Sequence, residues 1–434
     1  MSDNTLANRA IDVHGLARVE GEGSLHVRIA GGELESVELE IFEPPRFFEA
    51  FLRGRGFEEP PDITARICGI CPVAYQMSAC NAIEDACGVK VTPEISELRR
   101  LLYCGEWIQS HALHVYLLHA PDFFGFEDAV ELAAADRSAV ERGLRLKKAG
   151  NAIMERVGGR AIHPVNVRVG GFYRAPDTEE MASLAPVLRQ ALDDALETVE
   201  WVSGFEFPDA SHDYLFAALV DEARYAIESG TIHTTDGLKV SAGGFLDLVT
   251  EEHVQRSSAL HAKLRGKDTY LTGPLARYAL SSAKLPPLAA EAAHRSQLGE
   301  VCRNPFKSIV VRSVEIVAAC EEALRLVESY SRFDPPSVRL APRAATGAGA
   351  TEAPRGLLLQ RYAITEDGLI SDARIMPPTS QNQDAIEDDL RGVIASRLEW
   401  GDDDLRDLCE QAVRNHDPCI SCAAHFLDLS VEHK

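Results

Sequence analysis

The sequence predicts a mostly helical α+β protein, with one large helical core and small β-sheets near the N-terminus and before the C-terminal helices. Long stretches repeat apolar residues at helical spacing, and two separate stretches alternate apolar and polar residues as strands do. A hydrophobic content of 45% is typical of a globular chain that buries a sizeable core. The length allows two or three domains or one large one, and we interpret residues 1–434 as a single domain.

The N-terminal strands come first along the chain. Between residues 11 and 43, apolar residues alternate with polar ones on both sides of a turn at Gly31-Gly32, and a pair of prolines ends the pattern. A short helix is expected over residues 47–55.

The helical core is predicted from five further stretches with apolar residues at three- and four-residue intervals. They are residues 74–87, 94–119, 136–157, 184–202 and 289–330. The pattern between them, over residues 205–279, is mixed and assigns no element.

The last part of the chain alternates strands and helices. Residues 334–354, rich in Pro, Ala and Gly, are expected to form a loop. Strands are predicted over residues 356–364 and 369–376, and helices over residues 382–397 and 403–414.

Charge and composition exclude several function classes. The 67 acidic and 44 basic residues leave a formal charge of −23, which argues against a nucleic-acid partner. No apolar run reaches the length of about 18 residues that spans a membrane. The polar N-terminus contains no secretory signal, so we expect a cytoplasmic protein. Ten cysteines are too sparse for a disulfide scaffold in a chain of this length.

Two Cys-x-x-Cys motifs lie near opposite ends of the chain. Residues 66–72 read Arg-Ile-Cys-Gly-Ile-Cys-Pro, and residues 417–425 read Asp-Pro-Cys-Ile-Ser-Cys-Ala-Ala-His. Together they supply four thiolates, enough to hold a soft transition metal. A zinc ribbon places its two pairs only about 15–20 residues apart. The whole fold would therefore have to bring both cysteine pairs to one metal centre. The alternatives are a redox dithiol or a structural zinc site.

Both motifs resemble the two signatures of the large (catalytic) subunit of nickel–iron hydrogenases. Residues 18–23 (Arg-Val-Glu-Gly-Glu-Gly), 352–356 (Glu-Ala-Pro-Arg-Gly) and 378–382 (Pro-Thr-Ser-Gln-Asn) are similar to further motifs of that family. Residues 71–75 and 171–176 look most like its cytoplasmic, NADP-linked bidirectional branch, also called sulfhydrogenases. The resemblance implies that family's large-subunit fold and reversible heterolytic cleavage of H2.

The resemblance also implies a cofactor and its ligands. Cys68 and Cys419 would be terminal nickel ligands, and Cys71 and Cys422 would bridge nickel to an iron that carries one carbonyl and two cyanides. Glu20 would accept the proton that leaves through Cys419.

Arg355 would polarise the open face of the centre, because a guanidinium that stays protonated is a poor base. Contacts to the cyanides are expected from the group Pro354, Arg355, Pro378 and Thr379.

A secondary Mg²⁺ (or iron) site is implied at Glu49, His425 and the main-chain carbonyl near Ile375. Oxygen ligands suit Mg²⁺, whereas an imidazole beside it is unusual, so this assignment depends on the family pattern alone.

Three positions depart from that pattern. Tyr75 and Ser110 stand where many relatives carry His and Asp. Residues 426–434 extend past His425 and resemble a tail that a maturation endopeptidase removes. By contrast, His111, His114 and His119 share one helical face and are interpreted as packing residues.

Partners are required, because the chain contains neither another cysteine cluster for iron–sulfur centres nor a Gly-x-Gly-x-x-Gly motif after a strand. We expect a small subunit with iron–sulfur clusters, and diaphorase subunits that bind FAD and NADP. The rivals are a non-hydrogenase relative that retains the cysteines, and a structural zinc protein with four cysteine ligands.

Overall fold

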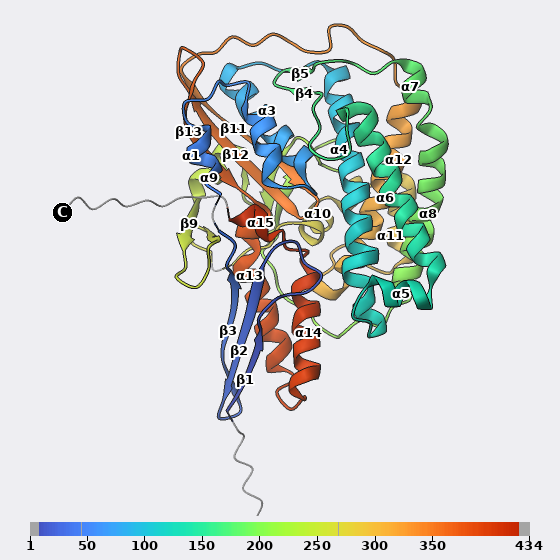
Figure 1. The fold of residues 1–434 in the computed structure, drawn as a ribbon, viewed down its shortest axis with the longest axis vertical. Coiled ribbons are helices and arrows are strands. Elements are labelled where there is room, and N and C mark those ends of the chain that lie inside the picture. Colours follow the sequence, from blue (N-terminus) through green and yellow to red (C-terminus); the bar gives the residue numbers. More distant parts are fainter. Residues whose placement is uncertain (1–7, 45, 268, 425–434) are drawn as a thin grey trace, which may run out of the picture.

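The computed structural model describes residues 8–44, 46–267 and 269–424. It is mostly helical with small antiparallel sheets, as predicted (Figure 1). Within these ranges, no helix is both long and apolar enough to cross a membrane.

The predicted N-terminal strands are confirmed as a three-stranded antiparallel sheet. Its strands are β1 (Arg9–Val13), β2 (Gly23–Ala30) and β3 (Glu33–Ile41), paired in that order. Alternation places the apolar side chains on one face, which packs against the C-terminal helices α13 (Pro378–Ala395) and α14 (Asp402–Asn415). The sheet runs alongside these two helices at the bottom of Figure 1.

Five long helices form the main body of the molecule. They are α3 (Pro72–Cys87), α4 (Pro93–Leu113), α6 (Arg137–Gly158), α8 (Ala185–Ser203) and α12 (Ser308–Glu328), and their apolar faces share one core. Thr92 caps α4 by accepting a hydrogen bond from the Ile95 N–H. The predicted helix over 94–119 leaves α geometry at His114 and continues as a π turn.

The single helix predicted over residues 289–330 is wrong. The structure has α11 (Pro287–Arg295) and then α12, separated by an irregular segment with the short turn η5 (Pro305–Lys307). Gln297 and Gly299 adopt positive φ in this segment, and Pro305 cannot donate a helical hydrogen bond. The apolar spacing continues across the break, which is why periodicity alone joined the two helices.

The sheet nearest the cysteines consists of β11 (Ala345–Ala353), β12 (Gly356–Ile364) and β13 (Ile370–Met376). The loop predicted over 334–354 is therefore wrong for its second half. Gly349 lies so close to α3 that a Cβ there would collide with the backbone of Ser78 and Ala82. The glycines and alanines that suggested a loop instead allow a strand to pack tightly on a helix.

The remaining elements connect these parts. The segment 205–279, left unassigned from the sequence, forms two small sheets and two helices. The C-terminal helix predicted over 382–397 begins earlier, at Pro378, because proline is well tolerated in a first helical turn.

The other elements are α1 (Phe48–Leu52), α2 (Pro60–Thr64), η1 (Ala65–Ile67), η2 (His114–His119), η3 (Ala120–Phe124), α5 (Ala129–Ala135), β4 (Val167–Arg168), β5 (Gly171–Phe172), α7 (Thr178–Ala182), β6 (Ala217–Val220), β7 (Thr231–Thr234), β8 (Lys239–Val240), α9 (Ala242–Leu248), β9 (Val249–His253), β10 (Leu260–Leu264), α10 (Pro274–Ser281), η4 (Ser282–Lys284) and α15 (Ile420–Ala423).

Candidate metal centre

The two cysteine pairs meet in the core. Cys71 precedes α3 and Cys419 precedes α15, so each pair lies at the start of a helix. Sγ of Cys68 lies 3.5 Å from Sγ of Cys419, and Sγ of Cys71 lies 3.7 Å from Sγ of Cys422. All four sulfurs lie within 4.8 Å of one another and are buried. The prediction that the fold brings the distant pairs together is confirmed.

Arg46 joins the two cysteine segments. Its guanidinium donates to the carbonyl of Ile67 at 2.7 Å and to the carbonyl of Ser421. Its backbone N–H donates to the Ala424 carbonyl at 3.0 Å. The role of Arg46 is not predictable from the sequence, because its partners are backbone atoms and leave no motif.

Glu106 of α4 fixes the first turn of α3. Its carboxylate accepts hydrogen bonds from the N–H groups of Val73 at 2.6 Å and Ala74 at 3.1 Å. A carboxylate suits the positive end of a helix, although burial raises the pKa of Glu106 well above its ordinary value. Cys71 thereby directly precedes a helical turn that is anchored to α4.

The donor set fits a soft metal centre. Hydrogen bonding from Cys419 lowers the pKa of Cys68 well below its usual value, whereas burial raises the pKa of Cys419. Four buried thiols at this spacing cannot all ionise against one another, since each negative charge disfavours the next. A bound cation removes the protons outright, and thiolates suit nickel and iron.

Glu20 lies directly beside the late cysteine pair. Its backbone carbonyl accepts from the Ile420 N–H at 2.9 Å, forming an isolated bridge with Cys419. Its carboxylate Oε2 lies 3.1 Å from Sγ of Cys419 and accepts from the Ser421 N–H at 3.1 Å. The geometry therefore allows a proton to pass between Cys419 and Glu20.

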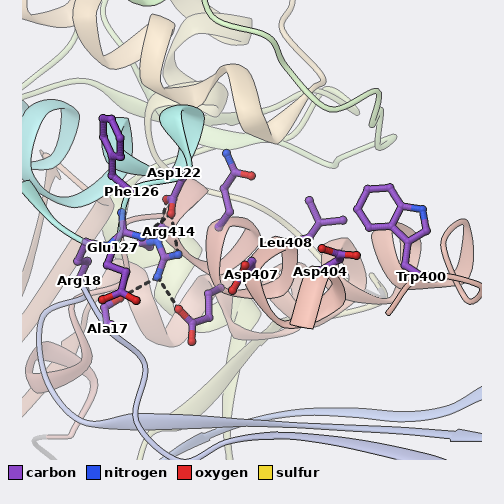
Figure 2. A pocket seen from close by; sticks show the side chains of 13 residues that line it. Ala17, Arg18, Asp122, Phe126, Glu127, Trp400, Asp404, Asp407, Leu408 and Arg414 are labelled. Carbon is purple, nitrogen blue, oxygen red and sulfur yellow. Dashed lines mark hydrogen bonds and ion pairs between the residues drawn. The ribbon is translucent and has the colours of Figure 1, made fainter. Parts of the chain in front are cut away.

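An ion cluster holds the Glu20 segment in place. Asp122 binds Arg18 at 2.5 Å and Arg414 at 2.8 Å, and Arg414 also donates to the Ala17 carbonyl at 2.9 Å. Figure 2 shows Asp122 and Arg414 joined beside Arg18, where they line a surface pocket of about 920 Å³. The chain before Glu20 is thus tied to the helix that leads to Cys419.

Arg355 lies in the turn between β11 and β12 and is almost fully buried. Its Nε donates to the Asp417 carbonyl at 2.9 Å and its Nη2 to Asp417 Oδ1 at 3.1 Å. Its Nη1 has no hydrogen-bond partner among the described residues. Burial opposes the charge, but Asp417 and the neighbouring thiols keep the pKa of Arg355 above its usual value. The guanidinium is therefore a fixed positive charge beside the cysteines.

A second arginine supports the Arg355 turn. Arg277 donates to the carbonyls of Ala353 at 2.9 Å and Pro354 at 3.0 Å, and binds Glu315 through two contacts of 2.7 Å. Its guanidinium lies 4.5 Å from the Trp107 ring centroid. Gly273, with φ of 109°, leaves room for the Arg355 carbonyl, which a Cβ would approach to 2.7 Å. Sequence reasoning missed Arg277 as well.

Thr379 and Pro378 begin α13 next to the late cysteine pair. The Thr379 hydroxyl oxygen accepts a hydrogen bond from the Cys419 N–H at 2.9 Å. This contact orients Cys419, a role of Thr379 that leaves no signal in the sequence.

The residues of the implied secondary metal site are only partly described. The Glu49 carboxylate accepts a hydrogen bond from the Ile375 N–H at 2.6 Å, so these two residues do meet. Burial raises the pKa of Glu49 to about 7. His425 lies outside the described residues.

The side chains of His111 in α4 and of His114 and His119 in η2 are buried, in line with the packing interpretation. His111 lies 3.0 Å from Glu315, and His114 Nε2 bonds the Arg414 carbonyl at 2.8 Å.

Comparisons with known proteins identify the family. The family model described as nickel-dependent hydrogenase matches residues 46–142. Sulfhydrogenase 1 subunit alpha of Pyrococcus furiosus is 32% identical over 96% of this chain and 98% of its own length. Sulfhydrogenase 2 subunit alpha of the same organism is also 32% identical, over 96% of this chain and 100% of its own.

The chain belongs to the nickel-dependent hydrogenase family. A crystal structure of an NAD⁺-reducing [NiFe]-hydrogenase matches with a TM-score of 0.87 at 26% identity, covering 96% of this chain and 100% of that one. This hydrogenase chain is the large, catalytic subunit, and its four cysteines hold the nickel–iron centre. The zinc interpretation is therefore set aside, and the family implies a small-subunit partner.

Proposed function

We propose that this subunit catalyses reversible oxidation of H2 and passes the electrons, through an iron–sulfur small subunit, to NADP(H). The observation that carries the catalytic part is the buried cluster of four sulfurs within 4.8 Å, with Glu20 and Arg355 at its edge. When bound, a nickel–iron centre with one carbonyl and two cyanides on iron supplies the site at which the H2 bond is split heterolytically.

The proton has a short path through this chain's own residues. Cys68 and Cys419 would be the terminal nickel ligands, and Cys71 and Cys422 the bridging ones. We assign Cys419 Sγ as the base that takes the proton and Glu20 Oε2, at 3.1 Å, as the acceptor that receives it. The Ser421 N–H at 3.1 Å keeps the carboxylate turned toward the sulfur.

Arg355 acts by its charge rather than as a base. Its position is fixed by Asp417, and its Nη1 is buried without a hydrogen-bond partner among the described residues, which suits a cyanide nitrogen as acceptor. The Thr379 hydroxyl accepts from Cys419 and still has its own proton to donate to a second cyanide. Pro354 and Pro378 would complete the apolar wall around these ligands.

A secondary Mg²⁺ or iron site is proposed at Glu49, the Ile375 carbonyl and His425. It is supported by the contact between Glu49 and Ile375, and by a buried carboxylate whose pKa of about 7 a cation would lower.

The electron acceptor is inferred from relatives. The NAD⁺-reducing structure and the relative named NAD-reducing hydrogenase HoxS subunit beta support a nicotinamide acceptor. We propose that the electrons reach it through FAD-containing diaphorase subunits. We also propose a cytoplasmic location and removal of residues 426–434 by a maturation endopeptidase.

The acceptor is tested with the affinity-purified native complex. Under H2, we expect NADP⁺ to be reduced faster than NAD⁺, with FAD and iron–sulfur clusters present in the partner subunits. A complex that reduces a viologen dye but neither nicotinamide would contradict the acceptor and leave the H2 chemistry standing.

A further inference from the structure

A chain of three side chains links the interior near Asp417 to the surface. His416 Nε2 lies 2.7 Å from Asp389 Oδ2, and His212 Nδ1 lies 3.2 Å from Asp389 Oδ1. The Tyr214 hydroxyl donates to the same carboxylate at 2.6 Å. The His416 and Asp389 side chains are 4% and 2% exposed, whereas His212 is 33% exposed.

Each end of this chain opens into a cavity. Asp389 and His212 line an outer cavity of about 220 Å³ between α13 and the segment before β6. His416 lines a small inner cavity of about 10 Å³ together with Arg312 and Asn415. A volume of this size holds about one water molecule where polar partners surround it. His416 and Asp389, which contact each other, therefore lie between the two cavities.

The inner cavity has the polar groups that a water needs. Arg312 Nε is buried and has no hydrogen-bond partner among the described residues. Buried polar groups of this kind are normally satisfied, and water is the group small enough to do so here. Asn415 and His416 directly precede Asp417, whose carbonyl binds Arg355 beside the cysteines. Two residues that line the inner cavity are thus adjacent in sequence to the residue that holds Arg355.

We propose that His416, Asp389 and His212 form a second proton route, which connects the Arg355 side of the metal centre with the solvent. The inference assumes the H2 cleavage proposed above and adds to it a path independent of Glu20. Histidine and carboxylate groups at hydrogen-bond distance are the side chains best suited to pass protons near neutral pH.

The steps balance one proton at a time. A proton passing outward binds His416 Nδ1 from the cavity water, while Nε2 releases its own to Asp389 Oδ2. The carboxyl group turns about its Cβ–Cγ bond and gives the proton to His212 Nδ1, and His212 Nε2 releases one to the solvent. No electron moves, and the charge of the three groups is the same before and after.

The electrostatics of the route agree with this direction. Burial tends to raise the pKa of Asp389, but hydrogen bonding with His212 and His416 brings it below its ordinary value, so the carboxylate is ionised and able to accept. The hydrogen bond to Asp389 raises the pKa of His212, which favours arrival of the proton at the surface end.

The route is tested in the holoenzyme by comparing two reactions of hydrogen gas. Conversion of para-hydrogen requires only that H2 is split, whereas exchange of D2 with water also requires the proton to travel. In a Glu20→Gln background, we expect residual exchange that Asp389→Asn lowers by about tenfold or more relative to conversion. Asp384→Asn is the matched control, because it removes a carboxylate of the same helix that also bonds a histidine, His261, at 2.8 Å.

Three outcomes would overturn the proposal. They are an unchanged exchange-to-conversion ratio in Asp389→Asn, an equal fall in Asp384→Asn, and no residual exchange in Glu20→Gln. Loss of para-hydrogen conversion in the native enzyme would instead refute the proposed function, so the two failures are distinguishable. Nickel and iron content and the infrared bands should be the same in all variants.

A second measurement does not depend on activity. In the full chain with ring-labelled histidines, NMR should report a pKa of His212 above the ordinary 6.5 that falls toward it in Asp389→Asn. A His212 titration that is identical in the native protein and in Asp389→Asn would show that His212 is not coupled to Asp389.

Discussion

At the scale of single residues, the centre is a set of thiols held by contacts that constrain each sulfur. Cys68 Sγ accepts from the N–H groups of Ile70 and Cys71 at 3.3 Å each, and the Cys419 backbone is held by Thr379. Such contacts place the donors before any metal arrives, which reduces the ordering cost of binding.

Replacing Glu20 tests the proton acceptor. In Glu20→Gln we expect D2–water exchange to fall on the order of 10²- to 10⁴-fold, because a positioned acid–base group contributes that much. The amide still accepts a hydrogen bond, so the metal content should be unchanged. Glu22→Gln is the control, since this neighbouring side chain is exposed. Full exchange activity in Glu20→Gln would exclude Glu20 from the route.

The lowered pKa of His111 leads to a prediction of how the stability of the folded chain depends on pH. Burial lowers the pKa of His111 from 6.5 to about 4 in the folded chain. Between these values the unfolded chain binds the proton and the folded chain does not, so stability falls as the pH drops from 6.5 to 4. The loss amounts to about 3 kcal/mol at most.

Urea midpoints measured from pH 7 to pH 4 check this prediction. The slope of the urea midpoint against pH should be smaller in His111→Gln than in the native protein. It should be unchanged in His14→Gln, because His14 is exposed. An equal slope in native protein and His111→Gln would contradict the assignment.

At the scale of elements, the Arg355 turn is held by α10, α12 and β11 meeting at Arg277. Burial would raise the pKa of Glu315, but Arg277 lowers it to about 2, so the pair is ionised inside the core. Glu352, which also binds Arg277 at 3.1 Å, has a pKa raised by burial to about 7.

Breaking the Arg277–Glu315 ion pair should lower the stability of the folded chain. Arg277→Met leaves Glu315 charged and buried, which we expect to lower the free energy of unfolding by about 3–5 kcal/mol. Arg325→Met removes a pair whose arginine is half exposed, and should cost about 0–1 kcal/mol. Denaturant unfolding measures both, and equal losses would mean that Arg277 is not the support of the turn.

At the scale of the whole molecule, the fold closes the two ends of the chain over one centre. Local patterns were enough to predict most strands and helices and, through the motifs, the residues that meet there. They failed where tertiary packing decides, as at Gly349, whose close contact with α3 turns an apparent loop into a strand. They also missed Arg46, Glu106 and Arg277, because each binds groups far away in the sequence, many of them backbone atoms. The assignment of residues 1–434 to one domain stays a prediction.

Metal analysis of the native complex, combined with infrared spectroscopy, tests the central claim most directly. We predict nickel and iron in equal amounts in this subunit, with carbonyl and cyanide bands, and loss of nickel in Cys419→Ser. Zinc alone, without those bands, would contradict the account.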